Sequence, residues 1–130
     1  MNKLLIISLL TFSNLVNAQT NFLCVAEKST GFQFNKSKND WESVKFIAES
    51  KFILKQTSSN LEVVKMGQAL PPIQCPKLKP NSILDCSSRG EHFTFNPVGL
   101  KFTYYSSGGY AVPAIFPDST IVEIGVCSPL

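Results

Sequence analysis

A nucleophilic site is the first chemistry that the residue types suggest. His92 is the only histidine, so any serine or cysteine nucleophile activated by an imidazole would depend on it. Asp85, Ser87 and Ser88 lie near it in the sequence and could supply the other members of a catalytic triad. No nucleophile-elbow pattern accompanies them. A surface histidine just before a strand explains His92 better, so we predict no catalytic residue here.

Metal and cofactor chemistry find no support in the residue spacing. Intervals of 50, 10 and 40 residues separate successive cysteines, and no Cys-x-x-Cys pair occurs. The chain also lacks a phosphate-binding glycine loop, a dinucleotide fingerprint and a calcium loop. We therefore predict neither a metal nor a cofactor. A carboxylate pair assembled by the fold from the nine acidic residues would still allow glycoside hydrolysis.

Aromatic side chains are the feature with most functional promise. Nine Phe, three Tyr and one Trp follow residue 18. Trp41, Tyr104, Tyr105 and Tyr110 are amphipathic, and such side chains line ligand pockets or anchor protein interfaces. Tyr104 and Tyr105 are adjacent in a predicted strand, so they should face opposite sides, with at most one in the core. These four residues are the predicted ligand-binding set.

Four cysteines in a small chain indicate two disulfides, typical of an exported protein. Three pairings are possible, and loop-closure entropy does not choose among them. We favour Cys75 with Cys86, because the prolines between them mark a compact loop. Cys24 would then pair with Cys127 and tie the first strand to the last.

The first 18 residues have the pattern of a secretory signal peptide. Lys3 precedes an apolar run too short to span a bilayer, and the small Ala18 ends the segment. We predict cleavage after Ala18, which would place the protein in the periplasm or outside the cell. An uncleaved anchor helix is the alternative, although Ser13, Asn14 and Asn17 interrupt the apolar run.

Cleavage would leave a single domain of 112 residues, 19–130. Its formal charge falls from +3 to +2 because Lys3 is the only charged residue removed. So small a charge gives no argument for nucleic acid or an anionic membrane. We expect no stable membrane insertion of the mature chain.

Short apolar or alternating runs separated by turn residues predict an all-β domain. The expected strands are at residues 21–27, 32–35, 41–46, 51–55, 61–66, 83–86, 93–95, 100–104 and 121–127, with 109–112 continuing the sequence of strands. Residues 93–104 form the clearest hairpin, because apolar residues alternate on both sides of Asn96-Pro97-Val98-Gly99.

Two segments are expected to interrupt these strands, and a third could form either a strand or a helix. Ser29-Thr30-Gly31 should break the first strand run, and proline-rich residues 67–80 should form an irregular loop. Residues 40–50 could instead hold one short helix, capped by Asp40, with Trp41 and Val44 on its apolar stripe.

We predict that these strands form a small antiparallel meander that closes as a barrel, with a β-sandwich as the alternative. In the barrel the apolar first and last runs would pair, which would remove both exposed edges.

Two resemblances add to this interpretation. The opening at 24–32 and the closing Val122-Glu123-Ile124-Gly125-Val126-Cys127 are similar to the two ends of a group of small exported bacterial proteins of uncharacterised function. Phe93-x-Phe95-Asn96, Leu100-Lys101-Phe102 and Gly109-Tyr110 are similar too. This resemblance implies a bacterial exported protein and no activity. Ser107-Gly108-Gly109-Tyr110 also resembles the Ser-Gly-rich loop of periplasmic lysozyme inhibitors, which are small disulfide-bonded barrels, although the surrounding pattern differs.

The sequence thus favours a non-enzymatic binding module for an unknown protein or a small apolar ligand. A small envelope hydrolase using His92 or a carboxylate pair, an inhibitor like those of lysozyme, and an accessory envelope protein are the alternatives.

Overall fold

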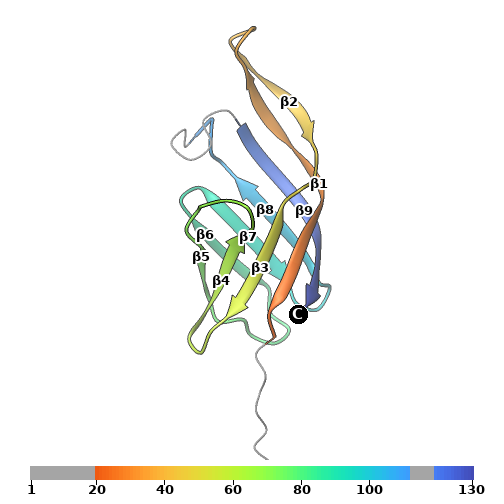
Figure 1. Ribbon diagram of the computed structural model, residues 1–130, viewed down its shortest axis with the longest axis vertical. Helices are drawn as coiled ribbons and strands as arrows, with labels where there is room; N and C mark the ends of the chain where they lie inside the picture. Colours follow the sequence, from red (N-terminus) through yellow and green to blue (C-terminus); the bar gives the residue numbers. More distant parts are fainter. Residues whose placement is uncertain (1–19, 112–118) are drawn as a thin grey trace, which may run out of the picture.

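A computed structural model describes residues 20–111 and 119–130, so the predicted signal peptide at 1–18 lies outside the described residues. The described part is all-β, as predicted, with no helix within those ranges. The described residues form nine strands, which are drawn as arrows in Figure 1. They are β1 (Phe22–Asn35), β2 (Asp40–Phe46), β3 (Lys51–Gln56), β4 (Asn60–Lys65), β5 (Ile73–Pro76), β6 (Leu84–Ser88), β7 (Glu91–Asn96), β8 (Lys101–Ser106) and β9 (Ser119–Pro129).

One antiparallel sheet curls into a nearly closed barrel with the strand order β5-β4-β3-β1-β9-β8-β7-β6. The first and last strands pair, as predicted, with Cys24 directly opposite Cys127. This pair lies in the middle of the sheet, so the open seam falls between β5 and β6 instead. The prediction that pairing of the first and last strands would remove both edges of the sheet is therefore wrong. The edge strands are β5 and β6.

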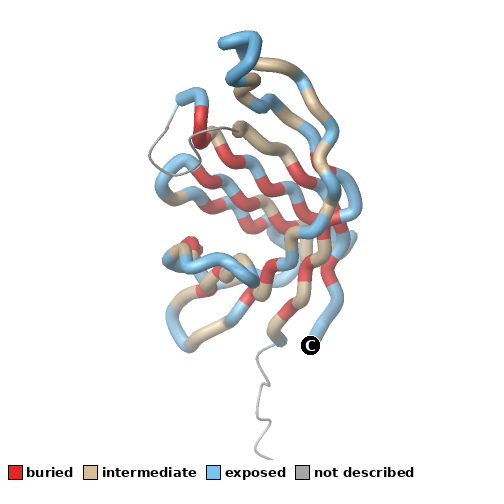
Figure 2. Tube along the Cα trace, turned by 45° about the horizontal axis from the view of Figure 1, so that its top comes forward, coloured by how far each residue is buried: buried red, intermediate tan, exposed pale blue. Residues whose placement is uncertain are grey.

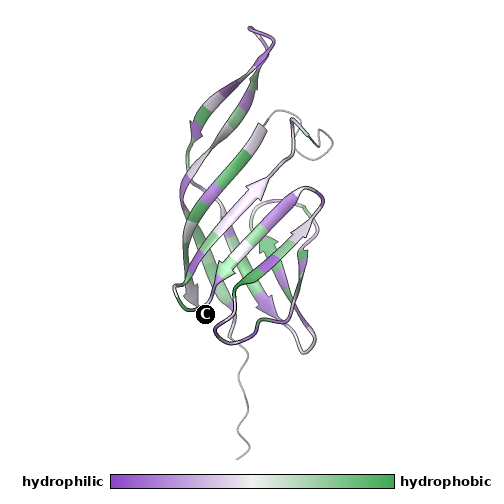
Figure 3. Cartoon of the chain, turned by 180° about the vertical axis from the view of Figure 1, so that it is seen from behind, coloured by the Kyte–Doolittle hydropathy of each residue, from purple (hydrophilic) through white to green (hydrophobic). Residues whose placement is uncertain are grey.

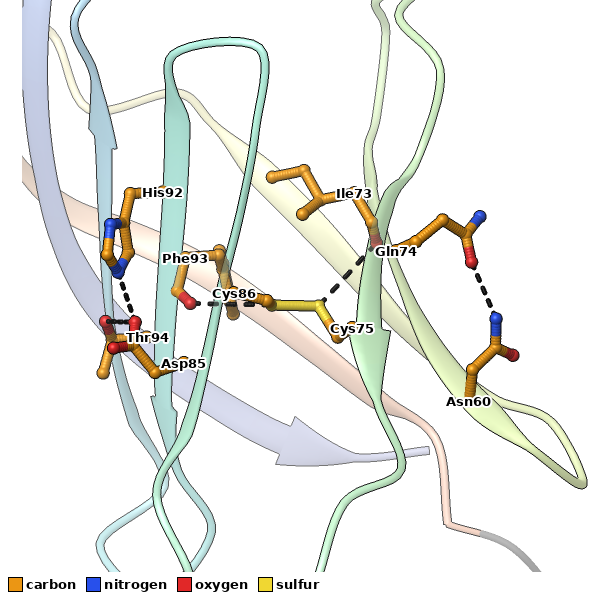
Figure 4. Close-up of a disulfide and its surroundings, with 9 residues drawn as sticks. All are labelled: Asn60, Ile73, Gln74, Cys75, Asp85, Cys86, His92, Phe93 and Thr94. Carbon is orange, nitrogen blue, oxygen red and sulfur yellow. Dashed lines mark hydrogen bonds and ion pairs between the residues drawn. A yellow bond between two sulfur atoms is a disulfide. The ribbon is translucent and has the colours of Figure 1, made fainter.

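Two disulfides join the predicted pairs. Cys24–Cys127 links β1 to β9 across a sequence separation of 103 residues. Cys75–Cys86 links β5 to β6, where no strand pairing closes the barrel, and Figure 4 shows it between the two strands. A covalent bond thus replaces the missing ladder at the seam.

The first strand does not break where Ser29-Thr30-Gly31 predicted. β1 runs continuously for 14 residues and absorbs one extra residue as a bulge between Ala26 and Lys28. Its first half pairs with β3 and its second half with β2, while β9 pairs with both halves. Gly31 lets the backbones of β1 and β9 lie close together at this point, because a Cβ there would lie 1.9 Å from the backbone oxygen of Thr120.

The helix considered for residues 40–50 is not formed. Residues 40–46 are β2, and Trp41 pairs with Phe34 across a hairpin that projects beyond the barrel (Figure 1). The segment pairs with β1 as a strand. A helix here would need another element to bury its apolar side chains, because most helical stability comes from such packing.

Two loop expectations also need correction. Residues 67–80 contain the short strand β5, because Ile73 and Cys75 alternate inward while Pro76 ends the strand at a sheet edge. Residues 109–111 form a turn instead of continuing a strand, and Val112 lies outside the described residues.

The core is built from the inward side chains of alternating strand positions. Figure 2 shows buried and exposed residues alternating along the strands. Phe52 packs its ring against Phe93, Phe102 and Tyr104 with centroid distances of 4.9–5.4 Å. The predicted 93–104 hairpin is the β7–β8 pair, and it supplies three of these four rings.

Candidate functional site

An aromatic cleft lies on the outer face of the sheet, beside the end of the barrel from which the β1–β2 hairpin projects. Its volume is about 360 Å³. The lining side chains come from β1, β2, β8, β9 and the turn after β8. They are Phe32, Trp41, Tyr105, Ser107, Tyr110, Ala111 and Thr120, which we call the aromatic cleft.

Strand register brings these side chains to one face. Inward positions of β1 before the bulge are Phe22, Cys24 and Ala26, and the extra residue shifts the alternation so that Phe32 points outward. Phe32 pairs with Thr120 of β9. Without the bulge, Phe32 would have the parity of the buried residues.

Aromatic contacts form one wall of the cleft. The Trp41 ring lies 5.7 Å from the ring of Phe34, its cross-strand partner. It also meets Tyr110 edge-on, with 5.4 Å between ring centroids. The β1–β2 hairpin therefore touches the turn after β8.

Hydrogen bonds hold that turn against two neighbouring segments. The Ser107 amide donates to the carbonyl of Gly90 at 2.8 Å, and its hydroxyl donates to the same oxygen at 3.0 Å. The Thr120 hydroxyl donates to the carbonyl of Gly108 at 2.8 Å. Gly109 has a φ of 85°, which a residue with a Cβ adopts at a cost.

The cleft exposes three large aromatic side chains to solvent. Tyr110 is 74% exposed, Phe32 52% and Tyr105 40%. Large apolar side chains gathered at one place are the usual mark of a binding site, whereas single exposed ones are ordinary. The side-chain hydrogen-bonding groups of the lining are the hydroxyls of Ser107, Thr120 and the two tyrosines, together with the indole N–H of Trp41.

Three of the four predicted binding residues, Trp41, Tyr105 and Tyr110, lie together in this cleft. Tyr104 does not, because it is fully buried inside the barrel. The expectation that at most one of the adjacent tyrosines is core is therefore confirmed. Phe32 also lines the cleft but is not among the predicted residues, because its alternation with polar neighbours is also the pattern of a core strand.

Tyr104 belongs to a polar cluster inside the barrel. Its hydroxyl donates to Glu91 Oε1 at 2.6 Å, and the ammonium of Lys65 lies 4.7 Å from its ring centroid. Burial, followed by the hydrogen bond and charge of Glu91, raises the pKa of Tyr104. Burial lowers the pKa of Lys65, and the carboxylates of Glu123 and Glu91 oppose that shift.

The buried Glu123 completes this cluster. The Ser50 hydroxyl donates to its Oε1 at 2.8 Å, whereas its Oε2 has no hydrogen-bond partner in the described part of the chain. Ser29, its cross-strand partner on β1, also has a buried hydroxyl without a partner there. Lys65 and two carboxylates thus keep charge inside the barrel, away from the aromatic cleft.

His92 lies on the exterior of the barrel, beside Tyr105 of the neighbouring strand. Figure 4 shows its ring bonded to Asp85, which also accepts a hydrogen bond from Thr94 at 3.2 Å. The hydrogen bond with His92, together with that from Thr94, lowers the pKa of the Asp85 carboxyl. Ser87 is the cross-strand partner of His92, but no hydrogen bond joins His92 to Ser87 or Ser88 among the described residues. The side chains of His92 and Asp85 are both solvent-exposed, so no water-excluded triad forms.

Across the described ranges, no group of three or more His, Cys, Asp or Glu side chains could hold a metal ion. Within the same ranges, no helix has the length and apolar character to cross a bilayer. Comparisons with protein-family models, with curated proteins and with solved structures found no match to this chain.

Proposed function

We propose that this protein is a non-enzymatic binding module that takes an apolar group, from a small ligand or from a partner protein, into the aromatic cleft. The observation that carries the proposal is the convergence of Phe32, Trp41, Tyr105 and Tyr110 from separate elements around about 360 Å³ of space. Ligand pockets commonly have this size and this mostly apolar lining with few polar groups.

Two further features support a binding role in an exported protein. The two disulfides fit an oxidising extracytoplasmic compartment. The cleft also has a firm frame, because the turn that carries Ser107 and Tyr110 is hydrogen-bonded to Gly90 and to β9. A firm cleft loses less conformational entropy on binding.

Binding of an apolar fluorescent probe, anilinonaphthalene sulfonate, tests the cleft directly. Tyr110→Ala and Phe32→Ala should each weaken probe binding on the order of tenfold, the effect of removing an aromatic anchor. Ile83→Ala and Val98→Ala are matched controls, because both residues are exposed and apolar but lie outside the cleft. Equal binding by all four variants would contradict the proposal.

Native mass spectrometry of protein purified from its own host would then identify the natural occupant. A retained small molecule or a co-purified partner should be lost in Tyr110→Ala and kept in Val98→Ala. An occupant retained equally by both variants would show that it binds elsewhere.

Inhibition of lysozyme is a second candidate function. One observation favours it: the segment 107–111, which contains the Ser-Gly-Gly-Tyr sequence, lies at the edge of the cleft and presents Tyr110 to solvent. An inhibitor of this kind would slow lysozyme hydrolysis of peptidoglycan, and Tyr110→Ala would abolish the effect. Unchanged hydrolysis at saturating protein would exclude this candidate.

A further inference from the structure

A second surface lies on the outer face of the barrel, over β3, β1, β9 and β8. Register places Lys51, Val25, Val126 and Lys101 side by side in one cross-strand row. In the next row Lys28 of β1 pairs with Ile124 of β9. We call Val25, Lys28, Lys51, Lys101, Ile124 and Val126 the basic face.

The apolar centre of this face is open to solvent. Ile124 is 47% exposed and Val126 is 39% exposed, and the two are alternate residues of β9. Figure 3, which views the molecule from behind, shows the apolar stretches of β9 in green. Gly125, between these two residues, is buried, and so are Glu123 and Cys127 on either side of them.

The lysines of the face carry uncompensated charge. Lys28, Lys51 and Lys101 are exposed, and none forms an ion pair within residues 20–111 and 119–130. Glu27, at the bulge, is the adjacent acid in the sequence. Asp85 is engaged with His92 on a different pair of strands. The small net charge of the whole chain therefore hides a local excess of positive charge.

We propose that the basic face docks the protein peripherally on a lipid surface that contains anionic phospholipids. Lysine ammonium groups would meet the phosphates, while Ile124 and Val126 would enter the boundary between headgroups and acyl chains. The long lysine side chains suit this arrangement, because their apolar stems can lie along the surface while the charged ends reach the headgroups.

Composition favours a lipid surface over an acidic protein. The centres of protein interfaces are depleted in charged residues, and lysine in particular is under-represented there. Here Lys51 and Lys101 flank Val25 and Val126 within one row, and Val126 is exposed. Aliphatic side chains mixed with lysine are typical of surfaces that bind anionic membranes. The proposal does not depend on the aromatic cleft.

Vesicle sedimentation tests the proposal. The sample is the predicted mature chain, residues 19–130, since the apolar run at 1–18 would itself bind lipid. All nine described strands and both disulfides lie in that part. The protein should bind vesicles of phosphatidylcholine and phosphatidylglycerol in equal parts, and not phosphatidylcholine alone. Binding should weaken as salt is added.

Matched triple variants locate the contact. The face variant combines Lys28→Gln, Lys51→Gln and Lys101→Gln. The control variant makes the same change in charge with Lys36→Gln, Lys77→Gln and Lys79→Gln. The face variant should lose on the order of 100-fold in vesicle partitioning, and the control much less, because each lysine near the surface contributes about fivefold. Equal losses would overturn the proposal.

Apolar substitutions and a soluble polyanion complete the test. Ile124→Ser with Val126→Ser should weaken vesicle binding, whereas Ile83→Ser with Val98→Ser should not. Tyr110→Ala should bind vesicles like the unchanged protein, which separates this surface from the cleft. Absence of vesicle binding at low salt, or equal binding to phosphatidylcholine alone, would overturn the proposal. Lysine-dependent binding to polyglutamate without vesicle binding would overturn it in favour of an acidic protein.

Discussion

Charged and polar side chains inside the barrel are held by a few specific contacts around Tyr104. Its hydroxyl satisfies Glu91, and its ring lies under the ammonium of Lys65. Both tyrosine and glutamate are buried, so water cannot replace a lost partner without opening the barrel. The hydroxyl of Tyr104 should therefore contribute more to stability than an exposed tyrosine hydroxyl does.

Tyr104→Phe should lower the free energy of unfolding by about 1–3 kcal/mol, because the buried carboxylate of Glu91 loses a donor. The matched control is Tyr105→Phe, in which the hydroxyl that is removed lies on the exposed face of the same strand. Urea unfolding with both disulfides intact measures the difference. Equal effects of the two substitutions would refute the importance of the buried bond.

The pH dependence of that difference follows from the raised pKa of Tyr104. A tyrosine of the unfolded chain ionises at about pH 10. The native chain keeps the Tyr104 proton above that pH, so its stabilisation is complete below pH 10 and declines as pH rises further. The stability advantage of the unchanged protein over Tyr104→Phe should shrink in urea unfolding above pH 10. An advantage that grew with pH would contradict the assignment.

Gly125 is a residue that the barrel cannot replace. A Cβ there would lie 2.1 Å from the carbonyl oxygen of Val25 and 2.7 Å from the ring of Phe102. Gly125→Ala should therefore lower the free energy of unfolding by about 3 kcal/mol. Gly99→Ala is the control, since its nearest neighbour is the movable side chain of Asn96 at 3.2 Å. If both variants had the same urea midpoint, the prediction would be contradicted, because β9 could then move away from β1 and Phe102 without loss of stability.

At the scale of elements, the strands that the sequence predicts well are those with local partners. The β7–β8 and β3–β4 hairpins need only alternation and a turn, and both residue ranges carry these signals. The sequence predicts two strands in place of β1, because Ser29-Thr30-Gly31 has the composition of a turn. Pairing with β9, about 90 residues away in sequence, holds it straight. Such distant pairing leaves no local mark.

The seam between β5 and β6 gives an element-scale prediction. Cys75→Ala with Cys86→Ala should lower the free energy of unfolding by about 3 kcal/mol. This is the loss of unfolded-chain entropy restriction expected for a bridge that closes a short loop. Hydrogen exchange should accelerate in β5 and β6, which have no strand partner across the seam.

Cys24→Ala with Cys127→Ala is the comparison for that experiment. The strand ladder between β1 and β9 continues on both sides of this bridge, so β5 should stay protected from exchange. If β5 exchanged equally fast with and without Cys75–Cys86, the disulfide would not be what holds the seam.

At the scale of the whole molecule, barrel closure assembles the aromatic cleft from five segments. Sequence reasoning identified Trp41, Tyr105 and Tyr110 by residue type, because amphipathic aromatic side chains are common in binding sites. It could not decide which of Tyr104 and Tyr105 is buried. Alternation along a strand shows that the two side chains lie on opposite faces of the sheet, but not which face is the inner one. It missed Phe32 because the bulge at Glu27 sets the outward direction of that side chain.

Export of the chain is the prediction that concerns the molecule in its cell. Protein recovered from the envelope or medium of its host should begin at Gln19, and its mass should rise by four hydrogens on reduction of the two disulfides. Intact-mass spectrometry measures both. Ala18→Arg should block processing, because signal peptidase needs a small residue there. Recovery of protein that retains residues 1–18 would contradict the cleavage site.

The central position of β1 sets the order in which the barrel can be completed. Its neighbour β9 (Ser119–Pro129) follows the other described strands in the sequence, so the first strand has no partner along that edge until residues 119–129 have been synthesised. Contacts between such distant segments make folding slow, on the scale of milliseconds to seconds. A nascent chain of this topology stays open until β9 is available to pair with β1, and an open chain is the form that can be threaded through a narrow translocation channel.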